Sequence, residues 1–298
     1  MQLDFAYILA AGKGTRMGEI GKRIPKPVWP IYEKSLLDLQ VAWCVELGFK
    51  KIYINAHYLA DVLQKEVEQI QKNYPVEIKI LFEDPLLDSG GCLHNLAEQP
   101  EVNYTGKVLL INSDQFFFFD QLYIAEAFNK LLTEKTAAVL FGLPVKKEEA
   151  YNETVIDVNG VLTEIKKTDG SYDFITYSGL GLIDLSRLKP IHGVSKFFES
   201  VADYKNEKVF FVTPKKFEYW DFGTLPLYVQ NIKKIHLYKA NNQESGFIKF
   251  LVKAQAFSPN KMNEWGYLNF LNKNAIDLNH QGKFVEDSIK FDELEQKI

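Results

Sequence analysis

The sequence contains little cysteine and no long hydrophobic run. Its two cysteines, Cys44 and Cys92, stand far apart, with no C-x-x-C pair and no cluster of histidines beside them. This spacing argues against a disulfide framework, and we expect two reduced thiols in a cytoplasmic protein. No stretch reaches the roughly 18 apolar residues that a membrane-spanning helix needs. The first residues also lack the basic start and the cleavage site of a signal peptide, so we expect none.

An excess of positive charge is absent as well. The 298 residues have a formal net charge of −4, which argues against nucleic acid or a membrane surface as the main partner. With 46% apolar and 25% charged residues, the composition is that of a globular protein. This length allows one large domain, or one domain with an appendage. Basic residues gather in a loop near the N-terminus, and such a local positive field favours a small anionic ligand.

That loop is built from small residues. An apolar run of strand length, residues 5–9, leads into Ala10, Ala11, Gly12 and, one residue further, Gly14. Small side chains let a ligand approach the backbone N–H groups closely. Successive N–H groups in such a turn form a concave anion site. The segment therefore predicts a strand that ends in a phosphate-binding loop.

Three cations accompany the small residues. Lys13 and Arg16 lie in the loop itself, and Lys26 follows between two prolines, Pro25 and Pro27. The prolines hold Lys26 in a stiff, extended segment. Backbone donors together with three positive side chains predict a site for a triphosphate.

Two commoner phosphate loops do not match. A Walker A loop ends in Gly-Lys-Ser/Thr, whereas here Lys13 lies between two glycines and Gly14 precedes Thr15. A dinucleotide fingerprint needs a third glycine where Met17 stands. The second predicted strand also ends in asparagine and alanine, residues 55–56, and not in an acidic residue. These features disfavour a nucleotide-dependent dehydrogenase.

Strand patterns alternate with helix patterns up to residue 144. Such alternation is typical of an α/β fold with a mixed, mostly parallel Rossmann-like sheet and helices on both faces. Sheets of this kind bind ligands at the carboxyl ends of their strands. After the first strand, we expect strands at 51–55, 76–82, 107–111 and 136–144, and helices at 35–47, 59–74 and 121–132 and from the loop 83–91 to Glu98.

Two aspartates stand where they could hold a cation. Asp114 follows the strand at 107–111, and Asp221 lies in the loop just before a helix at 224–238 that Thr224 caps. On the residues alone, each aspartate is equally an ordinary turn or loop acid. We interpret the four phenylalanines at 116–119 as packing residues.

The pattern changes beyond residue 150. Asn159-Gly160 is a strong signal for a hairpin turn, and a β-rich insertion at this point is a natural place for a second substrate. We expect hairpin strands at 154–158 and 161–167, a strand at 175–183, a helix at 195–206 and a strand at 209–212.

The last sixty residues, 239–298, differ in character and contain no chemical motif. They hold too many large apolar side chains to stay solvated, so we expect a folded appendage. It could pack on the core, on a second subunit or over the second substrate. The aromatic residues concerned are Phe247, Phe250, Phe257, Trp265, Tyr267 and Phe270.

Taken together, these motifs resemble a known family. The string Leu9-Ala-Ala-Gly-x-Gly-Thr-Arg-Met17, followed by Pro25-Lys26-Pro27, resembles the signature of the sugar-1-phosphate nucleotidyltransferases. Among these enzymes, the compact N-acetylmuramate-1-phosphate uridylyltransferases and mannose-1-phosphate guanylyltransferases look most similar. Further matching motifs stand in the family's order between residues 5 and 238. They are Ile54-Asn55-Ala56-His57, Asp88-Ser89-Gly90-Gly91, Asn112-Ser113-Asp114, Tyr177-Ser178-Gly179 and Trp220-Asp221-Phe222-Gly223-Thr224.

The resemblance implies a role for each matching residue. It implies Mg²⁺ as the cofactor, held by Asp114 and Asp221, and it implies Arg16 and Lys26 as catalytic groups. The implied nucleotide-binding residues are Leu9, Ala10, Ala11, Gly12, Lys13, Gly14, Thr15, Ser89, Gly90 and Gly91. The implied sugar-phosphate-binding residues are Asn112, Lys166, Ser178 and Gly179. The catalytic domain would span 1–238, with a β-rich sugar-binding insertion, and 239–298 would be a C-terminal appendage of unknown role.

The implied reaction joins a nucleoside triphosphate to a sugar 1-phosphate, giving a nucleotide sugar and pyrophosphate. The departure at Ser113 and the appendage leave room for a second interpretation, a nucleotide-binding regulatory module without turnover. The sequence departs from the family's pattern at three places. Ser113 replaces a glycine, the segment 18–24 lacks a Pro-Leu-Thr, and Trp220 stands one residue nearer to Asp221 than in the family. The sequence leaves the base, the sugar and the oligomeric state open, a homo-oligomer included.

Overall fold

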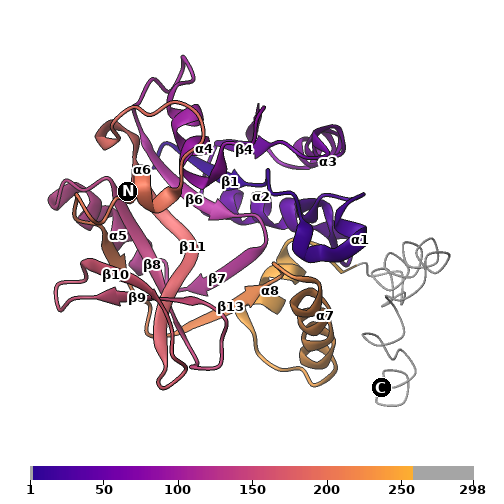
Figure 1. Cartoon of the computed structure of the whole chain (residues 1–298). Helices are drawn as coiled ribbons and strands as arrows, with labels where there is room; N and C mark the ends of the chain where they lie inside the picture. Colours follow the sequence, from indigo (N-terminus) through magenta and orange to yellow (C-terminus); the bar gives the residue numbers. More distant parts are fainter. Residues whose placement is uncertain (1–2, 258–298) are drawn as a thin grey trace.

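The computed structural model describes residues 3–257, and a seven-stranded sheet forms its centre (Figure 1). Across the sheet the strands are, in order, β12 (Phe210–Val212), β8 (Ala138–Val145), β11 (Phe174–Asp184), β6 (Lys107–Asn112), β1 (Phe5–Leu9), β4 (Lys51–Ala56) and β5 (Glu77–Phe82). Neighbouring strands run parallel except for β11, which is antiparallel to both β6 and β8. The predicted mixed, mostly parallel sheet is therefore confirmed.

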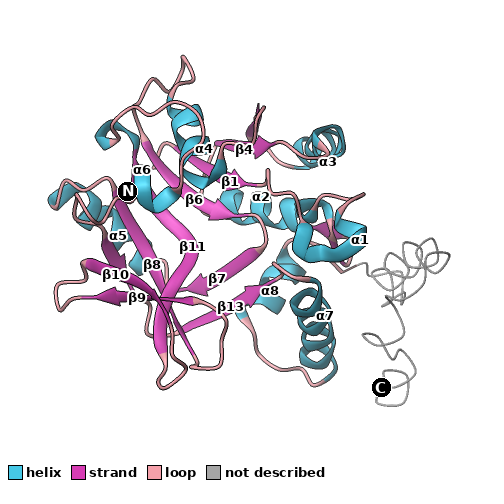
Figure 2. Cartoon of the chain, viewed as in Figure 1, coloured by secondary structure: helices cyan, strands magenta, loops and turns pink. Residues whose placement is uncertain are grey.

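Helices cover both faces of this sheet (Figure 2). Successive side chains of a strand point to opposite faces, so on β1 Ala6 and Ile8 join one hydrophobic cluster while Phe5 and Tyr7 join another. The first cluster lies under α2, α3, α5, α7 and α8, and the second under α4 and α6. The helices are α1 (Gly18–Gly21), α2 (Leu36–Glu46), α3 (Ala60–Asn73), α4 (Asp88–Ala97), α5 (Leu122–Thr133), α6 (Phe197–Ser200), α7 (Leu225–Ala240) and α8 (Gly246–Lys253), with 3₁₀ turns at Thr15–Met17, Lys26–Val28 and Leu185–Arg187.

Three small antiparallel pairs accompany the central sheet: β2 (Pro30–Ile31) with β3 (Lys34–Ser35), β9 (Asn152–Ile156) with β10 (Leu162–Lys167), and β7 (Gln115–Phe119) with β13 (Phe217–Asp221). The β9–β10 hairpin confirms the turn predicted at Asn159-Gly160, where Gly160 has a φ of 79°. This hairpin is the β-rich insertion that the sequence predicted.

The pair formed by β7 and β13 corrects two expectations. The phenylalanines at 116–119 do pack in the core, but they also form a strand, in which Phe117 lies opposite Tyr219. Asp221 is the last residue of β13 and not a loop residue. Neither strand shows a clear alternation of apolar and polar residues, and each finds its partner about a hundred positions away, so the local pattern could not reveal the pairing.

The helix predicted at 195–206 is also wrong in extent. Only α6, four residues long, is helical there, and two tight turns follow it. Val201 leaves the helical conformation at φ −120°, and the carbonyl of Asp203 then accepts hydrogen bonds from the N–H groups of Asn206 and Glu207. The apolar residues of this segment therefore reach the core from turns.

The first part of the predicted appendage packs on the core. Ser245 caps α8 through a hydrogen bond from the Ile248 N–H, and Phe247 and Phe250 belong to the same hydrophobic cluster as the central strands. The ring of Phe257 lies 4.6 Å from that of Tyr32. The remaining aromatic residues named above, Trp265, Tyr267 and Phe270, lie outside the described residues. Within residues 3–257, none of the helices has both the length and the apolar character needed to cross a membrane.

Candidate active site

An open cavity of about 340 Å³ lies at the carboxyl ends of β1, β4, β5 and β6. Its walls come from the loops that follow β1, β5 and β6 and from the last residues of β4. This is the edge at which parallel sheets bind ligands, as the sequence predicted. The predicted site residues that line the cavity are Leu9, Ala10, Ala11, Gly12, Arg16, Lys26, Ser89, Asn112 and Asp114.

Fewer backbone N–H groups of the loop after β1 are available to a ligand than the sequence indicated. The N–H groups of Ala10 and Ala11 donate to the Asn55 Oδ1, at 2.6 and 3.2 Å. Gly12 follows as an exposed residue, and a Cβ added to it would meet nothing within 4 Å. Close approach of a ligand to the loop backbone is therefore open from Gly12 onward.

Asn55 is held in turn by Glu83, a carboxylate that the sequence analysis did not single out. The Asn55 Nδ2 donates to the Glu83 Oε1 at 2.7 Å, and the Leu87 N–H donates to the Glu83 Oε2 at 3.0 Å. Glu83 is only 4% exposed, and this burial raises its pKa, an effect that the hydrogen bonds from Leu87 and Asn55 oppose. Asn55 lies at the end of β4 and Glu83 directly follows β5, its neighbour in the sheet. Polar residues at the ends of two neighbouring strands were the sequence signal that could have identified this pair.

The cationic residues of the first loop separate in the fold. Gly14, with a φ of 62°, begins the 3₁₀ turn Thr15–Met17, and the buried Met17 anchors that turn in the core. Arg16 lines the cavity, while the exposed Lys13 and Thr15 lie outside its lining. Of these predicted residues, the structure therefore brings Arg16 to the site.

Lys26 and Asp114 form an ion pair between the Lys26 Nζ and the Asp114 Oδ2. Both side chains are largely buried, and the two residues are 88 positions apart in sequence. A partly buried pair of this kind is only weakly screened by salt. The pair places a positive and a negative group side by side on the cavity wall.

Asp221 lies beside Asp114, and Gly223 stands between the two carboxylates. A Cβ added to Gly223 would lie 2.7 Å from the Asp221 Oδ1 and 3.1 Å from the Asp114 Oδ2. Two hydrogen bonds from backbone N–H groups fix this arrangement: the Gly223 N–H donates to the Asp221 Oδ1, and the Phe222 N–H donates to the Asp114 carbonyl. Only glycine leaves this space free between two negative groups.

The donor set of this pair fits Mg²⁺. Within residues 3–257 there is no group of three or more acidic, histidine or cysteine side chains arranged to hold a metal ion. Mg²⁺ nevertheless binds proteins through one or two carboxylates and takes its remaining ligands from water and substrate phosphates. Asp114 and Asp221 provide two carboxylates at one place.

A hydrogen-bond network orients Asp221. Its Oδ2 accepts from the Tyr151 hydroxyl at 2.6 Å and from the Gln115 Nε2 at 3.3 Å, and the Gln115 Oε1 accepts from the Asn112 Nδ2. Burial and the bond to Asp221 raise the pKa of Tyr151. Gly179, with a φ of 82°, must be glycine, because a Cβ there would lie 2.2 Å from the Gln115 Oε1. Sequence reasoning missed Tyr151 and Gln115, whose importance depends entirely on tertiary contacts.

Four predicted binding residues make other contacts in the structure. The N–H groups of Gly90 and Gly91 donate to the Ser195 carbonyl, and a Cβ on Gly90 would lie 2.3 Å from the Ser200 Oγ, so both glycines serve close packing of α4. The Ser178 hydroxyl donates to the Phe141 carbonyl at 2.8 Å. Lys166 lies on β10 with its Nζ 3.6 Å from Glu153. Their roles in binding substrate remain predictions.

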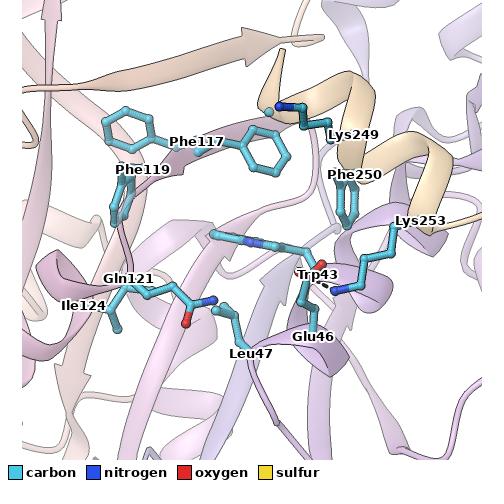
Figure 3. A pocket seen from close by; sticks show the side chains of 12 residues that line it. Trp43, Glu46, Leu47, Phe117, Phe119, Gln121, Ile124, Lys249, Phe250 and Lys253 are labelled. Carbon is cyan, nitrogen blue, oxygen red and sulfur yellow. Dashed lines mark hydrogen bonds and ion pairs between the residues drawn. The ribbon is translucent and has the colours of Figure 1, made fainter. Parts of the chain in front are cut away.

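A second cavity, of about 270 Å³, lies between α2, β7, α5 and α8. Figure 3 shows the rings of Trp43, Phe117, Phe119 and Phe250 around it, with the Lys253–Glu46 ion pair at its edge. Five of its lining residues are aromatic, and its two lysines, Lys249 and Lys253, are paired with Glu244 and Glu46. None of its lining residues lies at the carboxyl end of a parallel strand. The first cavity is therefore the candidate active site.

The fold and the cavity define an α/β protein with a cavity, lined by Arg16 and Lys26, at the carboxyl edge of its sheet. Comparison of the sequence with known families makes this more specific, because the model of the nucleotidyl transferase family matches residues 5–166. The match covers more than half of the chain, and the chain belongs to this family.

Individual relatives are distant. A UTP–glucose-1-phosphate uridylyltransferase of Synechocystis is 36% identical over 83 residues, which cover 28% of this chain and 21% of the relative. A mannose-1-phosphate guanyltransferase beta-A of Xenopus laevis is 24% identical over 205 residues, which cover 66% of this chain and 56% of the relative. The chain therefore spans between about a fifth and just over half of the length of these curated relatives.

Among solved structures, HddC from Yersinia pseudotuberculosis has a similar fold. Its TM-score is 0.62 at 21% identity, and the match covers 78% of this chain and 99% of HddC. The same protein complexed with GMP-PN matches with a TM-score of 0.60 at 22% identity. At this level of identity the likeness shows the fold.

Proposed function

We propose that this protein is a sugar-1-phosphate nucleotidyltransferase, which joins a nucleoside triphosphate to a sugar 1-phosphate and releases pyrophosphate. The observation that supports this most directly is that Arg16, Lys26 and Asp114 line one cavity and that Asp221 lies beside Asp114 across Gly223. The GMP-PN complex of HddC adds support for a nucleotide in this fold. The names of the relatives include both uridylyl- and guanylyltransferases, so UTP and GTP are both candidates.

Charge dictates the chemistry at such a site. A sugar-phosphate oxygen attacks the α-phosphorus of the triphosphate, the bond to the β-phosphate oxygen breaks, and pyrophosphate leaves from the opposite side. The nucleophile is already ionised, so no general base is required. The task of the protein is to neutralise two anions and align them in line.

The cations of the cavity would provide that neutralisation. We propose that Arg16 binds the departing β- and γ-phosphates and that Lys26 bridges the α-phosphate and the sugar phosphate. Lys13, which is exposed and outside the cavity lining, would aid Arg16. Because Lys26 is paired with Asp114, the substrates would compete with that carboxylate for the ammonium group. Leu9 to Thr15 and Ser89 would surround the nucleotide, and Asn112 would contact the sugar phosphate.

Asp114 and Asp221 would hold Mg²⁺, and their proximity across Gly223 supports this assignment. When bound, the ion would offset the negative charge that develops on the phosphates. Tyr151, Gln115 and the Gly223 N–H keep the Asp221 carboxylate in one orientation. We also propose a cytoplasmic location, supported by Cys44 and Cys92 being free, buried thiols.

The test is a pyrophosphate-release assay with the purified full chain, Mg²⁺, each nucleoside triphosphate in turn and a pool of hexose and heptose 1-phosphates. We expect release with UTP or GTP that depends on both the sugar phosphate and Mg²⁺. Binding of a nucleotide without any release would favour the alternative, a regulatory module without turnover. Two features support this alternative: Ser113, which stands in place of the family's glycine, and the C-terminal appendage. The assay also identifies the base, and repeating it with each sugar 1-phosphate of the pool in turn identifies the sugar.

A further inference from the structure

Asn55 connects the phosphate loop to the neighbouring strand where the sheet ends. The backbone ladder between β1 and β4 pairs Ala6 with Ile52, Tyr7 with Tyr53 and Ile8 with Ile54, and goes no further. One residue beyond that last pair, the Asn55 side chain accepts hydrogen bonds from the N–H groups of the loop. A side chain thus continues the connection after the backbone ladder has stopped.

The polarity of this connection is fixed at both ends. The Asn55 Oδ1 faces two N–H donors, those of Ala10 and Ala11, and its Nδ2 faces the Glu83 Oε1. A flipped amide would set donor against donor at the loop and acceptor against acceptor at Glu83. Glu83 is itself held by the Leu87 N–H. Ala10, Ala11, Asn55 and Glu83 are buried, so a bond lost between them would leave an unsatisfied polar group unless the loop moved.

We propose that Asn55 and Glu83 are positioning residues, which hold the β1 loop in the shape in which Gly12 and Arg16 meet the phosphates. The inference rests on the proposed function, because it concerns the loop that would bind the triphosphate. A loop of alanines and glycines has few side-chain contacts of its own and many accessible conformations. Without the Asn55 bonds, the N–H groups of Ala10 and Ala11 would turn to water, and the loop would lose its preformed shape.

Four variants separate polarity from mere packing. Asn55→Ala removes the bonds to the loop. Asn55→Asp retains an acceptor for Ala10 and Ala11 but sets a carboxylate against Glu83. In Glu83→Gln only one side-chain oxygen remains to accept, so the bond from either the Asn55 Nδ2 or the Leu87 N–H is lost. The double variant Asn55→Asp with Glu83→Gln restores every bond, because the new amide donates to the new carboxylate and still accepts from the Leu87 N–H.

The first measurement needs no ligand. Hydrogen exchange of the Ala10 and Ala11 amides in the full chain should become about tenfold faster or more in Asn55→Ala and Asn55→Asp, the scale of one net hydrogen bond. The double variant should recover the protection of the wild type. Tyr53→Phe is the matched control, because it removes a side-chain hydrogen bond, to Glu101, from the same strand but away from the loop.

The second measurement is the affinity for Mg²⁺–UTP and Mg²⁺–GTP by titration calorimetry. We expect Asn55→Ala and Asn55→Asp to bind the preferred nucleotide about tenfold more weakly than the wild type does. The affinity of the double variant should recover to within about threefold of the wild-type value. Lowering the pH should restore binding in Asn55→Asp alone, because a shared proton removes the repulsion between the two carboxylates.

The two measurements distinguish the possible failures. A wild type that binds neither nucleotide would contradict the proposed function, and the exchange experiment would still decide whether Asn55 holds the loop. Unchanged exchange in Asn55→Ala would overturn the inference. So would a double variant that stays as weak as Asn55→Asp while its melting temperature matches that of the wild type.

Discussion

At the scale of single residues, the structure turns two separate aspartates into one site. Asp114 follows β6 and Asp221 ends β13, and the sequence offered no reason for them to meet except the resemblance to a family. Their carboxylates lie on either side of Gly223, with Lys26 on Asp114 and Tyr151 on Asp221. These two partners, an ammonium group and a hydroxyl donor, orient the two carboxylates.

Removing the charge of either aspartate should stop catalysis without unfolding the protein. We expect Asp114→Asn and Asp221→Asn each to lower kcat by more than about 100-fold, because each loses a principal electrostatic stabiliser while keeping its shape. Steady-state kinetics at saturating Mg²⁺ would measure this. Asp61→Asn, on the exposed first turn of α3, is the control. Wild-type turnover in either variant would make that aspartate an ordinary loop or strand-end acid.

The cations should act mainly in the transition state. We expect Arg16→Ala to lower kcat more than it weakens nucleotide binding, and Lys26→Ala to do the same with respect to the sugar phosphate. Comparison of kcat with the dissociation constants would reveal this, with the exposed Lys205→Ala as the control. A change in melting temperature alone, with intact kinetics, would refute both assignments.

Sequence reasoning predicted the residues at strand ends and missed those that orient them. Asp114 follows an unmistakable buried strand, and the loop after β1 has a distinctive composition, so both could be placed at one sheet edge. Gln115 and Tyr151 are hydrogen-bonded to Asp221 from 106 and 70 residues away. Such networks depend on which side chains the fold brings together, and no local pattern records that.

At the scale of secondary-structure elements, the prediction succeeded wherever hydrophobic periodicity was strong. β1, β4, β5, β6 and α3 lie within a residue or two of their predicted bounds. The shortfalls have a physical origin: β7 and β13 are stabilised by each other and not by their own pattern, and α6 stops where the chain leaves the helical conformation at Val201. Tertiary pairing overrides local propensity at such positions.

The contact between α4 and α6 contains a buried histidine that should make stability depend on pH. The His94 Nε2 donates to the Ser200 carbonyl at 3.2 Å, and its Nδ1 lies 3.1 Å from the Tyr104 hydroxyl. Burial lowers the pKa of His94 below 6.5, and the carbonyl of Ser200 and the carboxylate of Glu98 oppose this shift. As the pH falls through 6.5, the unfolded chain therefore binds a proton that the folded chain does not.

We accordingly expect the wild type to lose stability as the pH falls from about 7.5 to about 5.5. His94→Gln should show a smaller loss over the same range, although it is less stable at neutral pH because it removes buried hydrogen bonds. Thermal melts at several pH values would measure both. Asn95→Gln, the neighbouring substitution without a titrating group, should keep the wild-type slope. Equal slopes for wild type and His94→Gln would show that His94 does not contribute to this pH dependence.

At the scale of the whole molecule, α8 connects the C-terminal part of the described chain to the hydrophobic cluster on one face of the central sheet. The ring of Phe247 lies 5.1 Å from that of Phe116 and 4.9 Å from that of Trp220, and the ring of Phe250 lies 5.5 Å from that of Phe118. Phe116 belongs to β7, which begins directly after Asp114, and Trp220 belongs to β13, which ends in Asp221. Loss of α8 would therefore loosen the β7–β13 pair on which Asp114 and Asp221 depend.

A chain truncated after Ala240 tests this dependence. It lacks Phe247 and Phe250, and each buried aromatic side chain that is removed costs about 3–5 kcal/mol at most. Because a domain has only about 5–15 kcal/mol of stability in total, we expect a large fall in melting temperature, together with lower kcat. A chain truncated after Phe257 retains every described contact and is the matched comparison. Solution mass, thermal melts and kinetics should be measured on both.

Unchanged stability and mass after Ala240, with a raised KM for the sugar phosphate alone, would instead make the C-terminal segment part of the sugar site. A halved mass with intact melting behaviour would make it a subunit contact. Under our interpretation stability and turnover fall together, because the aromatic residues of α8 pack against the same strands that position both carboxylates.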